Sequence, residues 1–413
     1  MLETIGQRAK QAEPVLRTLH TDVKNQALRQ VAEDLVKNQE EILAANAIDM
    51  KAGKESGLSE GLLDRLALNS QRIVAMAEGL CQLADLDDPI GEVSVMKERP
   101  NGLLIGQKRV PLGVVGIIYE ARPNVTADAF GLCFKTGNVV ILKGGSYAIH
   151  SNLAIVNCIR ASLSKCQVTP DAIQFIDDVS REVTVQFMKM NQYVDVLIPR
   201  GGAGLIQTVV NNSAIPVIET GTGNCHIYVD ESADLEMAAA IVINAKTQRV
   251  GVCNACESLL VHEKVKNDFL PVLAESLKEK HVIIHGDSQV CELAPEAVEA
   301  TEEDWGKEYL DYEISIKVVD SLDEAIEHIN RYNTKHSEAI VTNRYDHAQR
   351  FLNEVDAAAV YVNASTRFTD GFEFGYGAEI GISTQKLHVR GPMGLQALTT
   401  TKYIIYGNGQ IRP

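Results

Sequence analysis

Two cysteines, Cys253 and Cys256, stand three residues apart in the stretch RVGVCNACESLLV, residues 249–261. Cysteines at this spacing can clip a metal, form a redox couple, fill a core as apolar side chains, or provide one nucleophile beside a structural neighbour. A zinc site needs a second pair of ligands, and His226 and His262 do not stand at finger-like spacing. A thioredoxin-type couple belongs at a strand-to-helix turn, whereas here a helix is expected before the pair and a strand after it. A buried pair and a single nucleophile therefore stay open as the main interpretations.

Gly251 and Asn254 flank Cys253 and predict a bent, exposed loop in which a thiol could meet a ligand. Cys256 begins the strand that follows and is expected to pack in the core. A nucleophilic cysteine works as its thiolate, so its pKa, about 8.5 in model peptides, has to be lowered by its surroundings.

Two glycine-containing loops, KGGS (residues 143–146) and RGGAG (residues 200–204), each follow an expected strand and precede an expected helix. Glycines there let backbone N–H groups and a helix N-terminus approach a phosphate. Neither loop matches GxGxxG, and each alone is more often a plain turn, but two in successive units of one sheet favour a nucleotide site. The candidate cofactor-binding residues are Lys143, Gly144, Gly145, Ser146, Arg200, Gly201, Gly202 and Gly204. No acid immediately follows Lys143, so this lysine could meet a 2′-phosphate, which favours NADP over NAD.

Two polar loops supply candidate ligands for an anionic substrate. EARPN (residues 120–124) is expected at the carboxyl end of the first strand of a sheet, where ligands bind. There Arg122 could bind an anion, and Asn124 could either donate to an oxyanion or cap a helix. NASTRFTDG (residues 363–371) follows a later strand and is either a solvated loop or a clamp for a carboxylate or phosphate. The candidate substrate-binding residues are Arg122, Ser365, Thr366 and Arg367.

The order of the expected elements predicts an α/β protein. Residues 1 to about 90 have helical periodicity, with Leu28, Val31 and Leu35 on one face. The arms EVSVMKERP and LLIGQKRVP around Asn101–Gly102 predict a β-hairpin. From Leu112 apolar strands alternate with helices, which predicts a parallel sheet with right-handed crossovers. The alternation resumes after IPVIETGTGNCHIYVD and predicts a second α/β domain, ahead of a Gly-rich tail and a β-like KYIIYG.

The length and net charge of the chain restrict the classes of function that it can have. A chain of 413 residues exceeds one hydrophobic core, so two or more domains are expected. The net charge of −16 argues against binding to nucleic acid or to an anionic membrane, and an anionic small substrate would need a local cationic pocket. No secretion signal and no run of eighteen apolar residues is seen, so we expect a cytoplasmic protein whose eight cysteines are reduced.

The motifs PLGVVGII, NVVILKGG and IETGTGNCHI, with a cysteine 34 residues after Glu219, resemble the aldehyde dehydrogenase superfamily. YEARPNVT, LIPRGGAGLI, CHIYVDESAD, AKTQR, VYVNASTRFTDG and GPMGLQALTT resemble the branch that reduces L-glutamyl 5-phosphate in proline biosynthesis. The resemblance covers nearly the whole chain. It implies an aldehyde dehydrogenase-like α/β fold in three parts. These are a Rossmann-type cofactor domain (1–91, 112–228 and 375–397), a catalytic domain (229–374) and a small β oligomerisation unit (92–111 and 398–413).

The resemblance also selects Cys253 as the nucleophile and leaves Cys256 as a structural neighbour. It implies that the Cys253 thiolate displaces phosphate from L-glutamyl 5-phosphate, and that NADPH then reduces the thioester to glutamate 5-semialdehyde. By the same resemblance the Asn124 side chain and the Cys253 N–H stabilise the oxyanion, and Glu313 holds the nicotinamide ribose. The implied partners are further copies of the chain and, transiently, glutamate 5-kinase, which makes the labile acyl phosphate.

Glu219 aligns with the superfamily glutamate that activates water to hydrolyse a thioester. A reductase of acyl phosphates has to exclude water, so our hypothesis is that Glu219 orients the site or serves proton transfer. Two alternatives remain: an aldehyde oxidiser that releases a free acid, and a non-catalytic nucleotide-binding or thiol-sensing protein that uses the cysteine pair as a switch.

Overall fold

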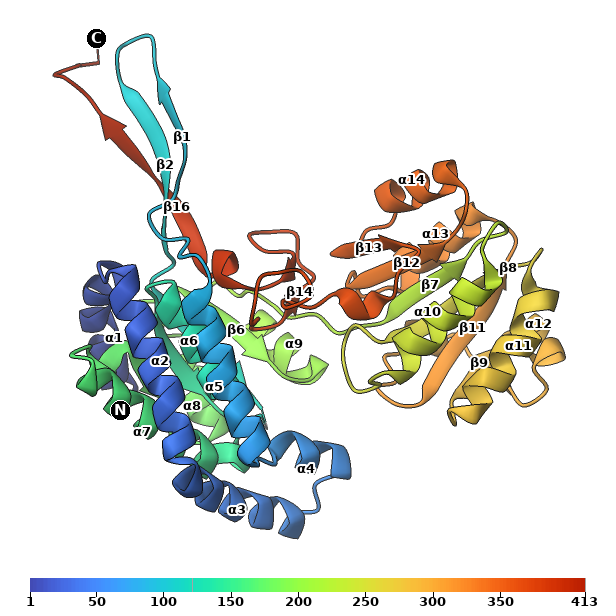
Figure 1. The fold of residues 1–413 in the computed structure, drawn as a ribbon, viewed down its shortest axis with the longest axis horizontal. Coiled ribbons are helices and arrows are strands. Elements are labelled where there is room, and N and C mark those ends of the chain that lie inside the picture. The colour runs from blue at the N-terminus through green and yellow to red at the C-terminus, as the bar shows by residue number, and fades with distance from the viewer. Residues whose placement is uncertain (121, 413) are drawn as a thin grey trace. The chain divides into compact units, whose positions relative to one another are not determined.

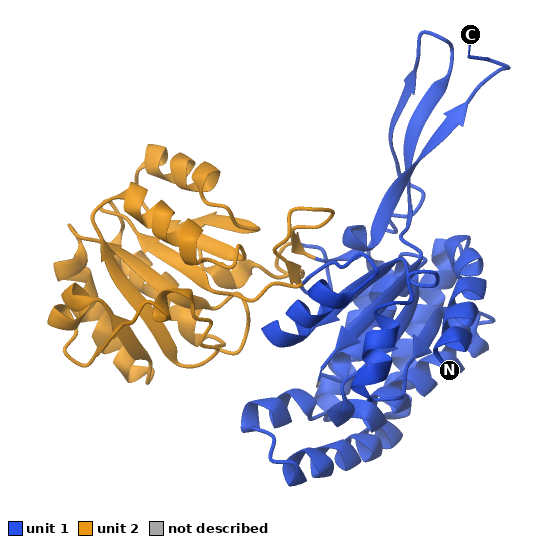
Figure 2. Cartoon of the chain, turned by 180° about the vertical axis from the view of Figure 1, so that it is seen from behind, with its two compact units in different colours: residues 1–219, 375–381, 393–413 blue, residues 220–374, 382–392 orange. Residues whose placement is uncertain are grey.

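The structure is a computed structural model that describes residues 1–120 and 122–412. Its chain divides into two compact units (Figure 2). Unit 1 comprises Met1–Glu219, Gly375–Gly381 and Met393–Pro413, and unit 2 comprises Thr220–Phe374 and Ile382–Pro392. Among the described residues, no helix is both long and apolar enough to cross a lipid bilayer.

Unit 1 begins with the five helices α1 Leu2–Arg17, α2 Thr21–Lys37, α3 Gln39–Glu55, α4 Glu60–Leu66 and α5 Ser70–Asp85. The predicted apolar face of α2 is confirmed, because Leu28, Val31 and Leu35 are fully buried. The helices α2 and α5 pack against each other and on α6 (Asn124–Lys135), which covers the sheet (Figure 1).

The sheet of unit 1 has four parallel strands in the order β5-β4-β3-β6. Its strands are β3 Val114–Tyr119, β4 Val139–Lys143, β5 Ile173–Phe175 and β6 Val196–Arg200. They alternate with α6, α7 Ile149–Lys165 and α8 Arg181–Phe187, and α9 Ala203–Asn212 follows β6. The first three strands are buried throughout, as expected when helices cover both faces of a parallel sheet. Gly137 ends α6 with a φ of 71°, a conformation that glycine adopts without strain.

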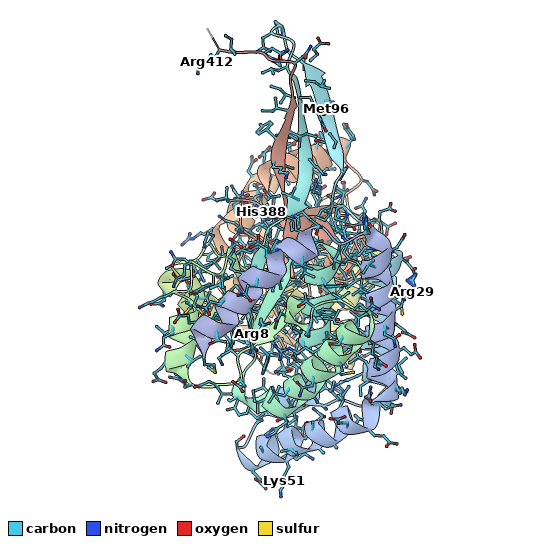
Figure 3. All side chains as sticks on the ribbon, turned by 90° about the vertical axis from the view of Figure 1, so that its left-hand side faces the viewer. Arg8, Arg29, Lys51, Met96, His388 and Arg412 are labelled. Atoms are coloured by element: carbon cyan, nitrogen blue, oxygen red, sulfur yellow. The ribbon has the colours of Figure 1, made fainter. Side chains whose placement is uncertain are left out.

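Three antiparallel strands form a ribbon on unit 1, in the order β1-β2-β16 (Figure 1). They are β1 Val93–Glu98, β2 Leu104–Pro111 and β16 Thr399–Tyr406. Figure 3 shows Met96 on this ribbon, beyond the helices that carry Arg8 and Arg29. The hairpin prediction is confirmed, but the centre of its turn lies one residue before Asn101–Gly102. The Gly102 N–H donates to the Arg99 carbonyl, so Pro100 and Asn101 are the central residues and Gly102 follows with a φ of 80°.

Unit 2 contains a parallel sheet of seven strands in the order β10-β9-β11-β8-β7-β12-β13. The strands are β7 Cys225–Val229, β8 Cys256–His262, β9 Ile283–Gly286, β10 Val298–Glu299, β11 Glu313–Val319, β12 Ser337–Val341 and β13 Ala359–Val362. One apolar cluster packs α10 Leu235–Thr247 and α11 Lys266–Glu279 on one face of this sheet. A second cluster packs α13 Leu322–Tyr332 and α14 Tyr345–Glu354 on the other face. The short elements α12 Ser288–Leu293 and β10 were not expected from the sequence.

The boundary between the units differs from the expected one. A boundary after residue 228 would cut β7, which pairs with β8 and β12, and the structure starts unit 2 at Thr220 instead. Residues 382–392, expected in the cofactor domain, lie in unit 2, where Lys386 and Arg390 form ion pairs with Asp356. The ribbon is part of unit 1.

Candidate active site

Cys253 lies in the loop between α10 and β8, whereas Cys256 is the first residue of β8. Cys253 is partly exposed, whereas Cys256 is fully buried as the first residue of β8 and its Sγ donates to the Ser258 carbonyl at 3.3 Å. Burial raises the pKa of Cys256 to about 12. The predicted packing of Cys256 is confirmed. In the described part of the chain, no three His, Cys, Asp or Glu side chains are grouped as metal ligands.

A third sulfur lies beside this loop. Cys225, the first residue of β7, is fully buried and its Sγ donates to the Cys253 carbonyl at 3.1 Å. Burial raises the pKa of Cys225 far above its ordinary value, and nearby carboxylate and thiolate charges add to the increase. Of these three thiols, Cys225 and Cys256 are therefore disfavoured as thiolates, and Cys253 is the one partly open to solvent.

His336 is a site residue that the sequence analysis missed. Its Nε2 lies 3.2 Å from the Cys253 Sγ, although the two residues are 83 positions apart in the chain. The His336 side chain is fully buried directly before β12, and its Nδ1 lies 2.8 Å from the Ser337 hydroxyl. A single histidine ahead of an apolar strand gives no signal in a sequence, because the same pattern is typical of a core histidine.

The position of this cluster follows from strand order. β7 lies between β8 and β12 in a parallel sheet, so the chain segments that enter these strands meet at one edge. Cys225, Cys253 and His336 all stand at this amino-terminal edge. Open α/β sheets more commonly bind ligands at the carboxyl ends of their strands.

Arg367 supplies a cation next to the cysteine. Its guanidinium bonds the side chains of Asn254 and Gln248, and its charge interacts with Cys253. Burial lowers the pKa of Arg367, and the neighbouring Arg249 lowers it further. The other two residues of the predicted clamp point elsewhere. The Ser365 hydroxyl accepts from the Arg367 N–H at 3.3 Å, and the fully buried Thr366 hydroxyl donates to the Asn254 carbonyl at 2.8 Å.

Glu313, the expected ribose ligand, begins β11 and is partly exposed. Its Oε2 lies 2.8 Å from His285 Nε2, and the His285 ring stacks on Tyr309 at a centroid distance of 5.2 Å. The Glu313 carboxylate therefore has a fixed neighbour in the His285 ring.

The RGGAG loop of unit 1 holds a carboxylate at the start of α9. The Gly202 N–H donates to Glu120 Oε2 at 2.9 Å, and a β-carbon at Gly201 would lie 2.6 Å from the same carboxylate. Gly202 and Gly204 have open space where side chains would stand, and residues 201–204 are exposed. A negatively charged oxygen thus already accepts from this helix N-terminus, which shows that the loop suits an anion.

The KGGS loop is different, because the helix that follows is already capped. Asp49 of α3 accepts from the backbone N–H and the hydroxyl of Ser151, at 2.8 and 2.6 Å, in the first turn of α7. A β-carbon at Gly144 would lie 2.3 Å from the amide nitrogen of Asn152, so packing accounts for this glycine. Gly145 lies against the backbone of Glu120, and Ser146 is exposed. A carboxylate therefore already stands at the start of α7, and the cofactor-binding role of the KGGS residues stays a prediction.

Lys143 ends β4 and is nearly buried, with its Nζ 3.3 Å from the Gly144 carbonyl. Burial lowers the pKa of Lys143, and the negative charge of Asp178 opposes this decrease. The sequence showed no acid directly after Lys143, yet the fold brings Asp178 into electrostatic range.

The remaining candidates lie at the end of β3 and at the end of the first segment of unit 1. The helix-cap interpretation of Asn124 is wrong, because Pro123 holds the cap position and Asn124 is the first helical residue. Its amide donates to Asp128 Oδ2 at 3.0 Å, and burial raises the pKa of Asp128 to about 6. Arg122 is partly buried in the turn before α6. Glu219 is partly exposed and ends the first segment of unit 1.

Known proteins resemble the chain over its whole length. The model of the aldehyde dehydrogenase family matches residues 2–304 and 314–404. A γ-glutamyl phosphate reductase of Moorella thermoacetica is 63% identical over 411 residues, 100% of this chain and 98% of the relative. The reductase of that name from Lachnospira eligens is 61% identical over 411 residues, 100% of this chain and 99% of the relative. The crystal structure of γ-glutamyl phosphate reductase from Thermotoga maritima is 50% identical, with a TM-score of 0.97 and full coverage of both chains.

Proposed function

Since the chain belongs to the aldehyde dehydrogenase family and, within it, to the γ-glutamyl phosphate reductases, we propose that this oxidoreductase reduces L-glutamyl 5-phosphate with NADPH. The products are L-glutamate 5-semialdehyde and phosphate, and the step belongs to proline biosynthesis. The reverse reaction makes the protein a phosphorylating glutamate-5-semialdehyde dehydrogenase. The observation that carries the chemistry is the partly exposed Cys253, whose sulfur lies 3.2 Å from the buried His336 imidazole and interacts with the charge of Arg367.

Cys253 is the proposed nucleophile. Its thiolate attacks the γ-carbonyl carbon, the bond from this carbon to the phosphate oxygen breaks, and a thioester forms on the sulfur. The oxyanion of this step needs fixed donors, for which we propose the Cys253 N–H and the Asn124 amide. Loss of one such donor typically costs about 100- to 1,000-fold in rate.

Arg367 is the proposed anion-binding residue nearest to the nucleophile. Its charge interacts with Cys253, and the exposed Arg249 lies within electrostatic range of Arg367. Thr366 and Ser365 bond the backbone of this region, which supports a role in positioning the loops rather than in touching the substrate. Arg122 remains a proposed ligand for the other acidic group of the substrate.

The residues of unit 1 suit a nicotinamide dinucleotide. When bound, the cofactor supplies the reducing equivalent for the thioester. We propose that Gly202 and Gly204 hold its pyrophosphate, because their loop is open and already accepts a carboxylate. Lys143 is the proposed contact for the 2′-phosphate of NADPH, and Glu313 for the nicotinamide ribose. Asp178 is a nearby carboxylate that would favour a 2′-hydroxyl, so it moderates the preference for NADPH.

Glu219 is proposed to orient the site or to transfer a proton, not to activate water. Glu219→Gln should therefore retain phosphate-dependent turnover, and complete loss of turnover in a folded variant would contradict this role. The ribbon β1-β2-β16 is the proposed oligomerisation unit, because it carries the exposed apolar side chains of Val95, Tyr403 and Ile405. A transient contact with glutamate 5-kinase and a cytoplasmic location complete the proposal.

The deciding experiment is reduction of NADP by the purified protein with glutamate 5-semialdehyde, with and without phosphate. We expect turnover that requires phosphate. An aldehyde oxidiser would run without it. Cys253→Ser should abolish turnover and Cys256→Ser should retain it, whereas a thiol-sensing switch would need both cysteines.

A further inference from the structure

His336 is a titratable side chain next to the reacting sulfur, with 3.2 Å between its Nε2 and the Cys253 Sγ. From this geometry we propose that His336 is the general base that ionises Cys253, and that Ser337, Thr369 and Tyr361 are positioning residues for its ring. The inference deepens the proposed function: it rests on Cys253 as the nucleophile, but not on which acyl group the sulfur attacks.

A chain of hydroxyl groups starts at Nδ1 of His336 and is able to select one tautomer of its ring. Its Nδ1 lies 2.8 Å from the Ser337 Oγ, which lies 2.6 Å from the Thr369 Oγ1, and this oxygen lies 2.7 Å from the Tyr361 hydroxyl. If Nδ1–H donates to Ser337, each hydroxyl can donate to the next, and Nε2 keeps its lone pair for the thiol of Cys253. After proton transfer the imidazolium still donates to Ser337 through Nδ1, so the chain does not have to reorganise.

The loops that carry the two partners are also joined. The Asn254 amide donates to the Thr369 carbonyl at 2.9 Å and to the Arg367 carbonyl at 3.2 Å. Thr369 thus bonds the residue after Cys253 through its backbone and the hydroxyl chain of His336 through its side chain. The distance between sulfur and imidazole is therefore held from both sides, as a pre-organised pair requires.

A cation next to the sulfur favours the thiolate. The groups that interact with the pair directly are Arg367 and Cys225 for Cys253, and Glu338 and Cys225 for His336. Around them, Arg249 and Asp370 interact with Arg367, and Tyr361 interacts with Cys225. Burial raises the pKa of Glu338 well above its ordinary value, and the charge of His336 opposes this increase. Arg367 interacts with the charge of Cys253, which stabilises the thiolate. A buried imidazolium is costly by itself, and its main compensation is the thiolate at 3.2 Å.

The proton stays on His336 through the cycle, and the reducing equivalent would come from the nicotinamide cofactor. The thiol proton passes from Sγ to Nε2, and the sulfur forms its bond to the acyl carbon while phosphate leaves with the electron pair of the broken bond and takes up a proton from solvent. After reduction, the carbon–sulfur bond of the thiohemiacetal breaks and its electron pair returns to sulfur. The Cys253 thiolate is then again beside protonated His336, ready for the next acyl phosphate.

The test is the rate at which iodoacetamide alkylates Cys253 in the intact protein, followed by mass spectrometry between about pH 5 and pH 10. We expect the wild-type rate to rise with pH and to reach its plateau at a pH well below the ordinary cysteine pKa of about 8.5. In His336→Gln the midpoint of this rise should move up toward that pKa, and the alkylation rate near pH 6.5 should fall about tenfold or more. Ser337→Ala, which keeps the imidazole, should shift the profile in the same direction by less.

His328→Gln is the matched control, because His328 is also buried in unit 2 but lies on α13. Its alkylation profile should equal that of the wild type. A folded His336→Gln with the wild-type profile would overturn the proposal. If His336→Gln does not fold, an unchanged profile in Ser337→Ala overturns it instead. Alkylation needs neither substrate nor cofactor, so failure of phosphate-dependent turnover with an intact profile shift would refute the proposed function and leave the pair standing.

Discussion

Gly223 lies directly against the backbone of Cys253. A β-carbon on Gly223 would stand 1.5 Å from the Cys253 carbonyl oxygen, closer than any two unbonded heavy atoms can come. The Gly223 N–H donates to Glu308 Oε1 at 2.6 Å, which fixes this strand-entry segment from its other side. The segment before β7 thus packs directly against the loop between α10 and β8 that carries Cys253.

Gly223→Ala should move the Cys253 loop while leaving both sheets intact. Because a displacement of about 1 Å in a reacting group can cost about 100-fold, we expect kcat to fall by that order. Gly306→Ala is the matched control, since no atom lies within 4 Å of a β-carbon at Gly306. Steady-state kinetics and the alkylation rate of Cys253 should fall together in the first variant and stay unchanged in the second. Wild-type values in Gly223→Ala would contradict the rigidity of this contact.

The buried ion pair of Lys246 and Glu257 joins α10 to β8, the two elements that flank the loop carrying Cys253. Nζ and Oε2 are 2.6 Å apart, and both side chains are fully buried. Burial raises the pKa of Glu257 to about 7, and the charge of Lys246 opposes this increase. Lys246→Met leaves the carboxyl buried without its cation, which should lower the free energy of unfolding by about 3–5 kcal/mol.

The double variant Lys246→Met/Glu257→Leu tests whether this loss of stability comes from the unpaired carboxyl group. It removes both polar groups, so its urea midpoint should recover most of the loss seen with Lys246→Met. If the double variant is as unstable as the single one, the loss comes from packing and not from the uncompensated carboxyl.

Asp356 should make unit 2 sensitive to acid. Hydrogen bonds from Lys386 and Arg390, at 2.9 and 2.6 Å, lower the pKa of Asp356 to about 2. An unfolded aspartate titrates near 3.9. Because the folded pKa is the lower one, the stabilisation is present above about pH 4 and is lost as the pH falls through about 2.

Thermal melting of wild type and Asp356→Asn across this range checks the sign. The difference in Tm should be largest above about pH 4 and should shrink toward pH 2. Glu279→Gln, on the exposed end of α11, serves as the charge-matched control and should show no such convergence. A pH-independent difference would mean that Asp356 acts through packing alone.

Glu120 should compete with the cofactor for the N-terminus of α9. Its carboxylate accepts from the Gly202 N–H at 2.9 Å, the kind of position in which a phosphate oxygen binds. Glu120→Gln removes the charge, so we expect NADPH to bind several-fold more tightly, with a weaker dependence on salt. Fluorescence titration with NADPH measures this, with the exposed Glu182→Gln of α8 as control. Weaker binding in Glu120→Gln would show that the carboxylate is a ligand of the cofactor.

Local patterns predicted most of the fold. The apolar spacing in α2, the buried runs of β3 and β4, and the glycine after α6 are each decided by residues within a few turns of one another. The same holds for the loop around Cys253 and the burial of Cys256, because both depend on where one helix ends and one strand begins.

Contacts between distant segments were decided only by the tertiary structure. Cys253 and His336, 83 positions apart in the chain, lie together because β8 and β12 pair with the two sides of β7. No local property of either residue specifies that strand order. Packing between distant segments likewise brings Asp49 to the start of α7 and Glu120 to the start of α9. Sequence by itself determined the element types and the family resemblance, which in turn selected Cys253 as the proposed nucleophile, since these are local or carried by motifs. The groups placed around Cys253 were decided by strand pairing and packing, which depend on the whole chain at once.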